Sequence, residues 1–266
     1  MESETKDSLM LNTAIEAAKR AGQIIAEQYP MERNVTQKGF RDLVTETDTA
    51  AEAVIIDTIK DRFPEHDILS EEAGAIPREG GYTWVVDPLD GTTNFAHHHP
   101  LFAVSIAIAK ADTPILGVIH DPLRHETFLA QRGAGATLND HPIRATLNKT
   151  LENAMIATDW GHTNEQREQM LAYLHPTLMG CGTVRSMGSA ALALAYVAAG
   201  RLDAYFQAKL NPWDVAAGTL LFREAGGRCT TLNGAPHRME LPDCLATNGH
   251  IHGALLEVIR AADKKR

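Results

Sequence analysis

Near residue 150 the chain changes its pattern of strand-like and helical segments, and this change limits the folds it can adopt. Before that point, apolar runs of high strand propensity follow one another across short turns, as in an antiparallel sheet. These runs are DILS (67–70), YTWVVD (82–87), FAVSIAIAK (102–110), ILGVIHD (115–121) and ETFLAQR (126–132). Beyond residue 150, strand-like and helical segments alternate. We predict an α+β first half and an α/β second half, packed as two lobes over residues 1–147 and 148–266.

Several segments show apolar residues at helical spacing. The first places Leu11, Ile15 and Ile25 on one face, with Asp7 or Ser8 as the expected N-cap. Further helices are predicted over residues 45–63, from 164, over 189–199, over 212–225 and from 252. In the second half, strands are predicted within 153–159, 182–187, 202–208, 227–232 and 243–248.

The charge balance argues against some classes of partner. The chain has 25 basic and 34 acidic residues and a net charge of -9, so we expect no broad cationic surface for nucleic acid or anionic lipid. The amino terminus lacks the basic start and apolar block of a secretory signal, and the uncharged stretch 186–200 is too short to span a bilayer. We expect a cytoplasmic protein without membrane contact.

The cysteines give little indication of a metal or redox site. Cys181, Cys229 and Cys244 are odd in number and widely spaced, and none has a second cysteine near it in the sequence. We expect buried, reduced thiols.

The octapeptide DPLDGTTN (87–94) places two carboxylates three residues apart between a strand and a helix start. The bulky run WVV before it predicts a buried strand, with Asp87 at its carboxyl end. Free amide groups at the helix start after Gly91 would attract phosphate. Two ionised carboxylates in such a turn repel each other unless a cation lies between them, which favours a divalent metal. A solvated acidic turn with Asp90 as a helix cap is the alternative.

The three-residue spacing of Asp87 and Asp90 argues against a haloacid-dehalogenase-type phosphatase, whose nucleophilic aspartate begins a DxD motif with a two-residue spacing.

Other carboxylates that could join Asp87 and Asp90 are Glu71 and Glu72, after the run ILS, and Asp214 in NPWDVAAG. Taken singly, these could be a solvated helix start and a capping residue. Hard oxygen ligands from three segments, without a Cys/His set at zinc spacing, favour magnesium over zinc.

Five motifs, in this order, resemble the inositol monophosphatase family over nearly the whole chain. They are DLVTETD, LSEEAG, WVVDPLDGTTNF, RSMGSAALALAYVAAGRLDAYF and NPWDVAAG…REAGG. The family comprises magnesium-dependent, lithium-sensitive phosphomonoesterases. The resemblance implies a layered αβαβα sandwich, a homodimer, and an active site between the lobes that holds two or three Mg²⁺ ions.

The resemblance also implies roles for individual residues. Glu71, Asp87 and the main-chain carbonyl of Leu89 would bind the first Mg²⁺, and Asp87, Asp90 and Asp214 the second. A metal-activated water would attack the phosphate directly, without a phosphoenzyme intermediate.

The water would be oriented or deprotonated by Glu71 and the Thr92 hydroxyl, which Asp48 would polarise. Asp48 could instead form only a capping box with Thr45. Residues expected to bind substrate, some of them through main-chain amides, are Asp90, Gly91, Thr92, Thr93, Arg185, Ala190, Gln207 and Asp214.

Two basic features leave alternatives open. Consecutive histidines point in different directions, so His97, His98 and His99 are expected in a loop or helix end, with His97 as a neighbour of the site. Arg185 could contact substrate or a subunit interface, or could form a structural ion pair.

Substrate identity is left open by two departures from the family pattern. Gln207 stands where typical members carry a glutamate that faces the sugar ring, and Lys209 lies close by. Inositol 1-phosphate is the expected substrate, with fructose 1,6-bisphosphate and histidinol phosphate as alternatives. A non-enzymatic regulator that keeps the fold is a further alternative.

Overall fold

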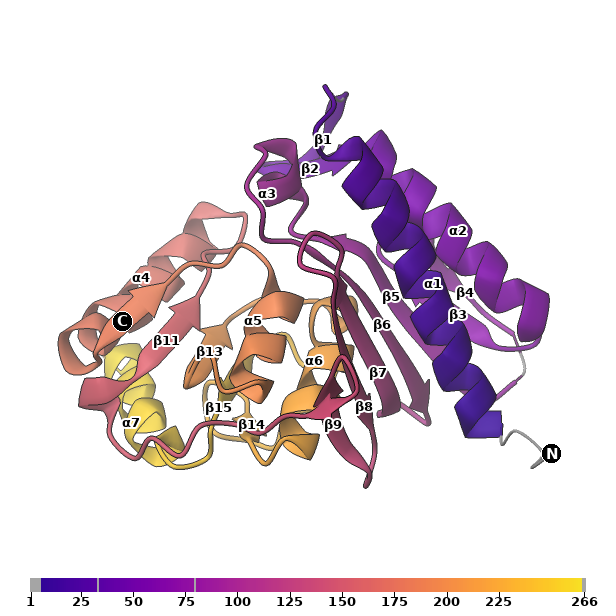
Figure 1. Ribbon diagram of the computed structural model, residues 1–266. Coiled ribbons are helices and arrows are strands. Elements are labelled where there is room, and N and C mark those ends of the chain that lie inside the picture. The colour runs from indigo at the N-terminus through magenta and orange to yellow at the C-terminus, as the bar shows by residue number, and fades with distance from the viewer. Residues whose placement is uncertain (1–5, 33, 79, 265–266) are drawn as a thin grey trace.

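The computed structural model describes residues 6–32, 34–78 and 80–264, which form five stacked layers (Figure 1). The helices α1 (Lys6–Gln28) and α2 (Glu46–Arg62) cover one face of an eight-stranded sheet. Its other face packs against α6 (Pro212–Glu224), which lies beside α5 (Ala190–Ala198). A five-stranded sheet follows, with α4 (Asn164–Gly180) and α7 (His252–Asp263) at the outside. This is the predicted αβαβα arrangement.

The larger sheet is mostly antiparallel, as the short turns between its strands predict. Its strand order is β10-β9-β8-β7-β6-β5-β3-β4, and the β3–β5 pair alone is parallel. The strands are β3 (Asp67–Ser70), β4 (Gly74–Ile76), β5 (Tyr82–Asp90), β6 (Ala103–Lys110), β7 (Thr113–Asp121), β8 (Glu126–Gln131), β9 (Gly135–Leu138) and β10 (His141–Pro142). All five predicted strands of the first half are therefore present.

The smaller sheet is mixed and has the strand order β12-β11-β13-β15-β14. The strands β12, β11 and β13 are parallel, whereas β15 runs antiparallel to β13 and β14. Their bounds are β11 (Met155–Thr158), β12 (Thr183–Arg185), β13 (Ala204–Gln207), β14 (Arg228–Thr230) and β15 (Cys244–Thr247), preceded by the 3-10 turn η1 (Leu151–Asn153). Each lies within a predicted segment.

Local capping explains several helix starts. Thr45 and Asp48 form a capping box at the start of α2, and Ser189 caps α5 through the amide of Leu192. The expected cap of the first helix is wrong, because Asp7 and Ser8 lie inside α1, which already includes Lys6. Acidic side chains are favoured throughout the first helical turn, so composition alone did not locate the cap.

Strand β5 continues beyond Asp87, so the prediction that Asp87 ends the strand is wrong. Asp87 pairs with Ser105 and Asp90 pairs with Ala103, which leaves one extra residue on β5 between these pairs. Such a bulge bends a strand, and Pro88 fits there because it has no amide hydrogen to donate to the ladder. The irregularity turns both aspartates toward the same region before α3 (Thr92–Ala96) begins.

A hairpin of β1 (Val35–Gly39) and β2 (Asp42–Thr45) was not predicted. All five residues of β1 are exposed, so the strand lacks the alternation of apolar and polar residues by which strands are recognised. Figure 1 shows the hairpin at the edge of the molecule, with β2 beside α3.

The two halves of the chain share a core. The helices α5 and α6 come from the second half, and α6 lies so close to β7 that a Cβ on Gly117 would stand 3.1 Å from the Ala217 carbonyl oxygen. The boundary between residues 147 and 148 stays a prediction. Among the described helices, none has the length and hydropathy needed to cross a bilayer.

Candidate metal and phosphate site

Three aspartates meet where β5 approaches the start of α6. Asp87 and Asp90 come from the end of β5, and Asp214 comes from the first turn of α6. One carboxylate oxygen from each lies within 4.8 Å of the other two. The structure thus brings together three of the five predicted ligands, and these come from both halves of the chain.

These carboxyl groups lie where negative charge is unfavourable. Burial raises the pKa of Asp87 well above its usual range, and the nearby Glu71, Asp90 and Asp214 raise it further. Burial also raises the pKa of Asp214, and the negative charge of Asp90 raises it further. The pKa of Asp90 is raised by burial to about 6, although hydrogen bonds to its carboxylate oppose this. A cation among these groups would relieve the repulsion.

Glu71 lies beside the three aspartates, at the end of β3. Its carboxyl group hydrogen-bonds with Asp87, and its pKa is raised by burial against the opposing charge of Lys38. The turn that carries Glu71 is held by the buried Glu52 on α2, whose Oε1 accepts the Ala73 amide at 2.9 Å. The sequence indicated neither Glu52 nor its role.

Lys38 of the unpredicted hairpin also reaches this region. Its Nζ lies 3.3 Å from Glu71 Oε1 and contacts Glu72 as well. Glu72 therefore pairs with Lys38 at the rim, whereas Glu71 lies between Lys38 and Asp87. The exposed strand β1 offered no sequence signal for this contact.

Asp48 divides its two oxygens between a helix cap and the site. Its Oδ2 accepts the Thr45 amide at 2.9 Å and the Thr45 hydroxyl at 2.6 Å. Its Oδ1 accepts the Thr92 hydroxyl at 2.8 Å, and this hydroxyl also lies 3.0 Å from the Leu89 carbonyl oxygen. The hydrogen bonds to Thr45 support the role of Asp48 as a helix cap, and the one to Thr92 supports its predicted role in the site. The Leu89 carbonyl lies next to the same Thr92 hydroxyl.

The turn after Asp90 requires glycine. Gly91 has φ of 99°, and a Cβ there would stand 2.9 Å from the Leu101 carbonyl oxygen. No side chain caps α3, which begins at Thr92, so its first amides remain available to a ligand. Thr93 is exposed. This matches the predicted helix start.

Asn94 connects this turn to the loop before α5. Its Nδ2 donates to the Leu101 carbonyl at 2.7 Å and to the Met187 carbonyl at 2.8 Å. The side chain thereby fixes the turn of β5 and α3 against the segment that leads to Ser189.

Asp90 lies at the amino terminus of α5. It accepts the Ser189 hydroxyl and the amides of Ala190 at 3.3 Å and Ala191 at 2.8 Å. The amide of Ala190, a residue predicted to bind substrate, donates to Asp90 in this structure. Asp159, which was not predicted, lies close enough to raise the pKa of Asp90.

Gln207 is buried on β13, where its Oε1 accepts the Tyr205 hydroxyl at 2.6 Å. Lys209 follows with φ of 62°. Arg185 is exposed on the edge strand β12, where it donates to Thr183 Oγ1 at 2.6 Å and to the Val184 carbonyl. These contacts do not place Arg185 among the aspartates.

The three histidines lie at a helix end, as predicted. His97 is the C-cap of α3, and its amide donates to the Thr93 carbonyl at 3.1 Å. All three side chains are exposed, and the His98 carbonyl accepts the Tyr29 hydroxyl.

The residues around the aspartates fit a hard divalent cation. Asp87, Asp90, Asp214 and Glu71 offer carboxylate oxygens, and the Leu89 carbonyl lies close to the same turn. Oxygen donors of this kind suit Mg²⁺, and the set contains no sulfur or imidazole that would favour zinc.

Comparison with known proteins supports the resemblance seen in the motifs. The model of the inositol monophosphatase family matches residues 6–264. The Escherichia coli protein named Nus factor SuhB is 43% identical over 255 residues, covering 94% of this chain and 96% of its own. An inositol-1-monophosphatase from Synechocystis is 40% identical, covering 94% of this chain and 88% of its own.

The fold agrees with solved structures as well. The crystal structure of extragenic suppressor protein SuhB from Bartonella henselae superposes with a TM-score of 0.92 at 37% identity. The match covers 95% of this chain and 99% of that one.

Proposed function

Because this chain belongs to the inositol monophosphatase family, we propose that it is a Mg²⁺-dependent phosphomonoesterase acting on a small polyol phosphate, with inositol 1-phosphate as the expected substrate. The observation that carries the proposal is the meeting of Asp87, Asp90 and Asp214 beside a turn with free helix amides. Ionised carboxylates that lie this close repel each other unless a cation lies between them, so their convergence supports metal binding.

The proposed metal ligands are five groups around one turn. They are the side chains of Glu71, Asp87, Asp90 and Asp214 and the carbonyl of Leu89. Bound Mg²⁺ would neutralise the phosphate and make a water molecule more acidic. The family supports metal dependence, while the identity and number of the ions, two or three, belong to this proposal.

Thr92 and Glu71 are proposed to orient the attacking water. Since the Thr92 hydroxyl donates to Asp48 Oδ1, its lone pairs can accept a hydrogen bond from water. The Glu71 carboxylate would take the proton as the water oxygen bonds to phosphorus. The phosphorus–oxygen ester bond then breaks, and the alcohol leaves with a proton from solvent.

The phosphate is proposed to rest on the amides of Gly91, Thr92 and Thr93. Glycine at the first of these positions lets the chain turn with a positive φ, so that successive amides can face an anion. Direct hydrolysis on this cradle needs no nucleophilic side chain.

The substrate pocket is proposed to include Gln207, Ala190 and Arg185. The Gln207 amide can donate or accept hydrogen bonds but lacks the charge of a glutamate. Fructose 1,6-bisphosphate and histidinol phosphate therefore remain alternative substrates.

Two further parts of the proposal do not depend on the pocket. They are the assembly of the protein as a homodimer and its location in the cytoplasm.

A second candidate function is a regulator that binds another macromolecule. The name of the Escherichia coli relative, Nus factor, favours it. The convergence of Asp87, Asp90 and Asp214, two of them buried and one partly buried, favours the phosphatase, because a regulator has no need for such a cluster.

Phosphate release tests the proposal. We expect turnover that requires Mg²⁺, falls with Li⁺, and decreases by at least two orders of magnitude in Asp90→Asn and Asp214→Asn. The matched control is Asp61→Asn, which changes an exposed carboxylate on α2. Retained turnover in either site variant would refute the ligand assignment.

A substrate panel separates the alternatives. The ratio kcat/KM is compared for inositol 1-phosphate, fructose 1,6-bisphosphate, histidinol phosphate, 3′-phosphoadenosine 5′-phosphate and NADP. Highest efficiency on the first supports the proposal, and the absence of turnover on all of them with Mg²⁺ present supports the regulator.

A further inference from the structure

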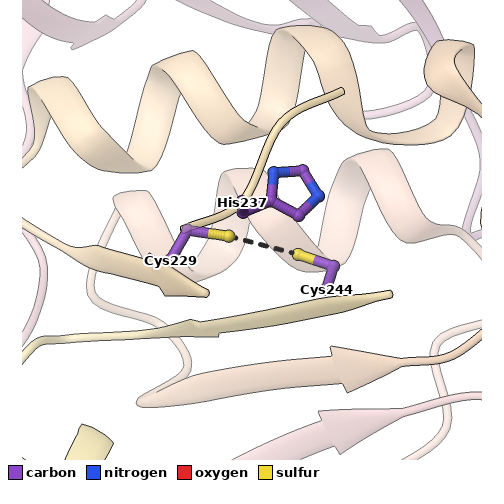
Figure 2. Close-up of side chains that lie close together, drawn as sticks. All are labelled: Cys229, His237 and Cys244. Atoms are coloured by element: carbon purple, nitrogen blue, oxygen red, sulfur yellow. Dashed lines mark hydrogen bonds between the residues drawn. The ribbon is translucent and has the colours of Figure 1, made fainter. Parts of the chain in front are cut away.

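A second group of ligating side chains lies in the smaller sheet. Cys229 on β14, Cys244 on β15 and His237 in the connection between these strands lie close together (Figure 2). Cys229 and Cys244 are distant in the sequence but adjacent in the structure, and the expectation of buried thiols is wrong for Cys181 and Cys229, which are only partly buried. Sequence spacing missed the group because the pairing of β14 with β15 brings the two cysteines together.

The two thiols lie on neighbouring strands in a diagonal arrangement. Cys229 is directly opposite Ala246, so Cys244 stands two residues further along β15, on the same face of the sheet. The sulfur atoms are 3.6 Å apart. One ligating atom from each of Cys229, Cys244 and His237 lies within 4.8 Å of the others.

His237 supplies an independent indication of a ligand. The side chain is 4% exposed, and neither Nδ1 nor Nε2 makes a hydrogen bond of normal geometry to a described residue, although the ring lies close enough to the Cys229 thiol to lower its pKa. A buried imidazole without partners is costly, and a bound ion would satisfy one of its nitrogens.

The connection that carries His237 is held firmly. Thr230 forms an isolated β-bridge with Pro236, directly before the histidine. The His237 carbonyl accepts Arg223 Nη2 at 2.8 Å. The three side chains are therefore positioned before any ion binds, which reduces the cost of binding.

The sulfur spacing suits an ion better than a disulfide. Diagonal neighbours on antiparallel strands have Cα atoms roughly 7–8 Å apart, at or beyond the usual limit for a disulfide. Two thiolates bound to one tetrahedral Zn²⁺ at about 2.3 Å would place their sulfurs about 3.8 Å apart, close to the observed separation.

We infer that Cys229, Cys244 and His237 form a zinc-binding site with its fourth position open to water. Two thiolates and one imidazole are a known ligand set for Zn²⁺ and balance its charge. Cys229 is only partly buried, which leaves a route for the ion. The inference is independent of the proposed phosphatase activity, since it uses none of the acidic residues.

The ionisation of the pair agrees with this arrangement. Burial opposes a charge on Cys229, but the hydrogen bond between Cys229 and Cys244, together with His237 and Arg223, lowers the pKa of Cys229 to about 6. Cys244 would release its proton when the ion binds, since metal binding displaces thiol protons.

Metal analysis and cobalt substitution test the site. The full chain is purified under reducing conditions, dialysed with excess Mg²⁺, and presented with one equivalent of Zn²⁺ or Co²⁺. We expect about one zinc per chain, and a near-ultraviolet thiolate-to-cobalt charge-transfer band. Cys229→Ser, Cys244→Ser and His237→Gln should each weaken zinc binding by at least tenfold.

The matched control is Cys181→Ser, which alters the C-cap of α4 outside the group and should keep the zinc and the cobalt band. Asp90→Asn should also keep the band, which separates this site from the acidic one. Equal zinc affinity in Cys229→Ser, or no stoichiometric uptake by the folded protein, would overturn the inference.

A measurement on the wild-type protein tests the zinc site even if the variants fail to fold. Zinc should slow alkylation of Cys229 and Cys244 at least tenfold, as followed by peptide mass spectrometry, while Cys181 reacts at an unchanged rate. Equal alkylation of all three thiols with and without zinc would contradict the site, as would a Cys229–Cys244 disulfide that forms in the presence of zinc.

Discussion

At the scale of single residues, several carboxylates of the acidic site also serve a helix end. Asp48 caps α2 with one oxygen and accepts the Thr92 hydroxyl with the other. Asp214 accepts the Asn211 amide at 2.7 Å, completing a capping box at the start of α6. Structural and functional interpretations of these residues therefore do not exclude each other, because a carboxylate has two oxygens and about four acceptor positions.

Substitutions of Thr45 and Thr92, the two hydrogen-bond partners of Asp48, can separate its role as a helix cap from its role in the site. Thr92→Val removes the hydroxyl that faces the proposed water, so we expect turnover to fall on the order of a hundredfold with little change in stability. Thr45→Val removes the helix cap and should cost about 1 kcal/mol of unfolding free energy. Steady-state kinetics and urea denaturation measure the two effects; an equal loss of turnover in both variants would count against a role for Thr92.

A buried histidine links stability to pH. Burial lowers the pKa of His252 to about 4, with Arg228 as a smaller cause. Between pH 6.5 and 4 the unfolded chain binds a proton that the folded one does not, so the stabilisation present above pH 6.5 is lost as the pH falls.

His252→Gln should therefore reduce the decline in unfolding free energy between pH 7 and pH 4.5, by on the order of 2 kcal/mol. Urea denaturation at several pH values measures this decline in unfolding free energy. His175→Gln alters an exposed histidine on α4 and should keep the wild-type decline. An unchanged decline in His252→Gln would show that this residue is not responsible.

At the scale of elements, the periodicity of apolar residues predicted most helices and strands. The deviations from these predictions have local causes. The bulge at Pro88 extends β5 past Asp87, and the exposed β1 carries no apolar alternation. Helix ends were predicted where a side chain caps them, as at Thr45 and Ser189.

The contact between α5 and α6 depends on a glycine. A Cβ on Gly218 would lie 2.6 Å from the Leu194 Cβ, so Gly218→Ala should destabilise the protein by about 1–3 kcal/mol through overpacking. Gly253 in α7 has no atom within 4 Å of such a Cβ, and Gly253→Ala should be neutral or stabilise by up to about 1 kcal/mol. Thermal or urea unfolding measures both; similar effects of the two substitutions would contradict close packing at Gly218.

At the scale of the whole molecule, the acidic site joins the two halves of the chain. Asp87 and Asp90 belong to the larger sheet, whereas Asp214 belongs to a helix between the sheets. A cation bound by all three would therefore stabilise the packing of one half on the other.

We accordingly expect Mg²⁺ to raise the Tm. At a concentration about 100-fold above its dissociation constant, a ligand adds about 2.7 kcal/mol, or roughly 5–10 °C for a protein of this size. Differential scanning calorimetry measures the shift. Asp214→Asn should lose most of it and Asp61→Asn none, and a full shift in Asp214→Asn would mean that the ion binds elsewhere.

The sequence by itself determined the family, the main helices and strands, and the acidic residues proposed for the candidate site. Side-chain periodicity, caps and the DPLDGTTN turn act over a few neighbouring residues and can be read along the chain. Only the tertiary structure decided that Lys38 reaches Glu71, and that Cys229 and Cys244 face His237. Such contacts depend on strand register and on the stacking of layers, which bring together segments whose local sequences carry no sign of each other.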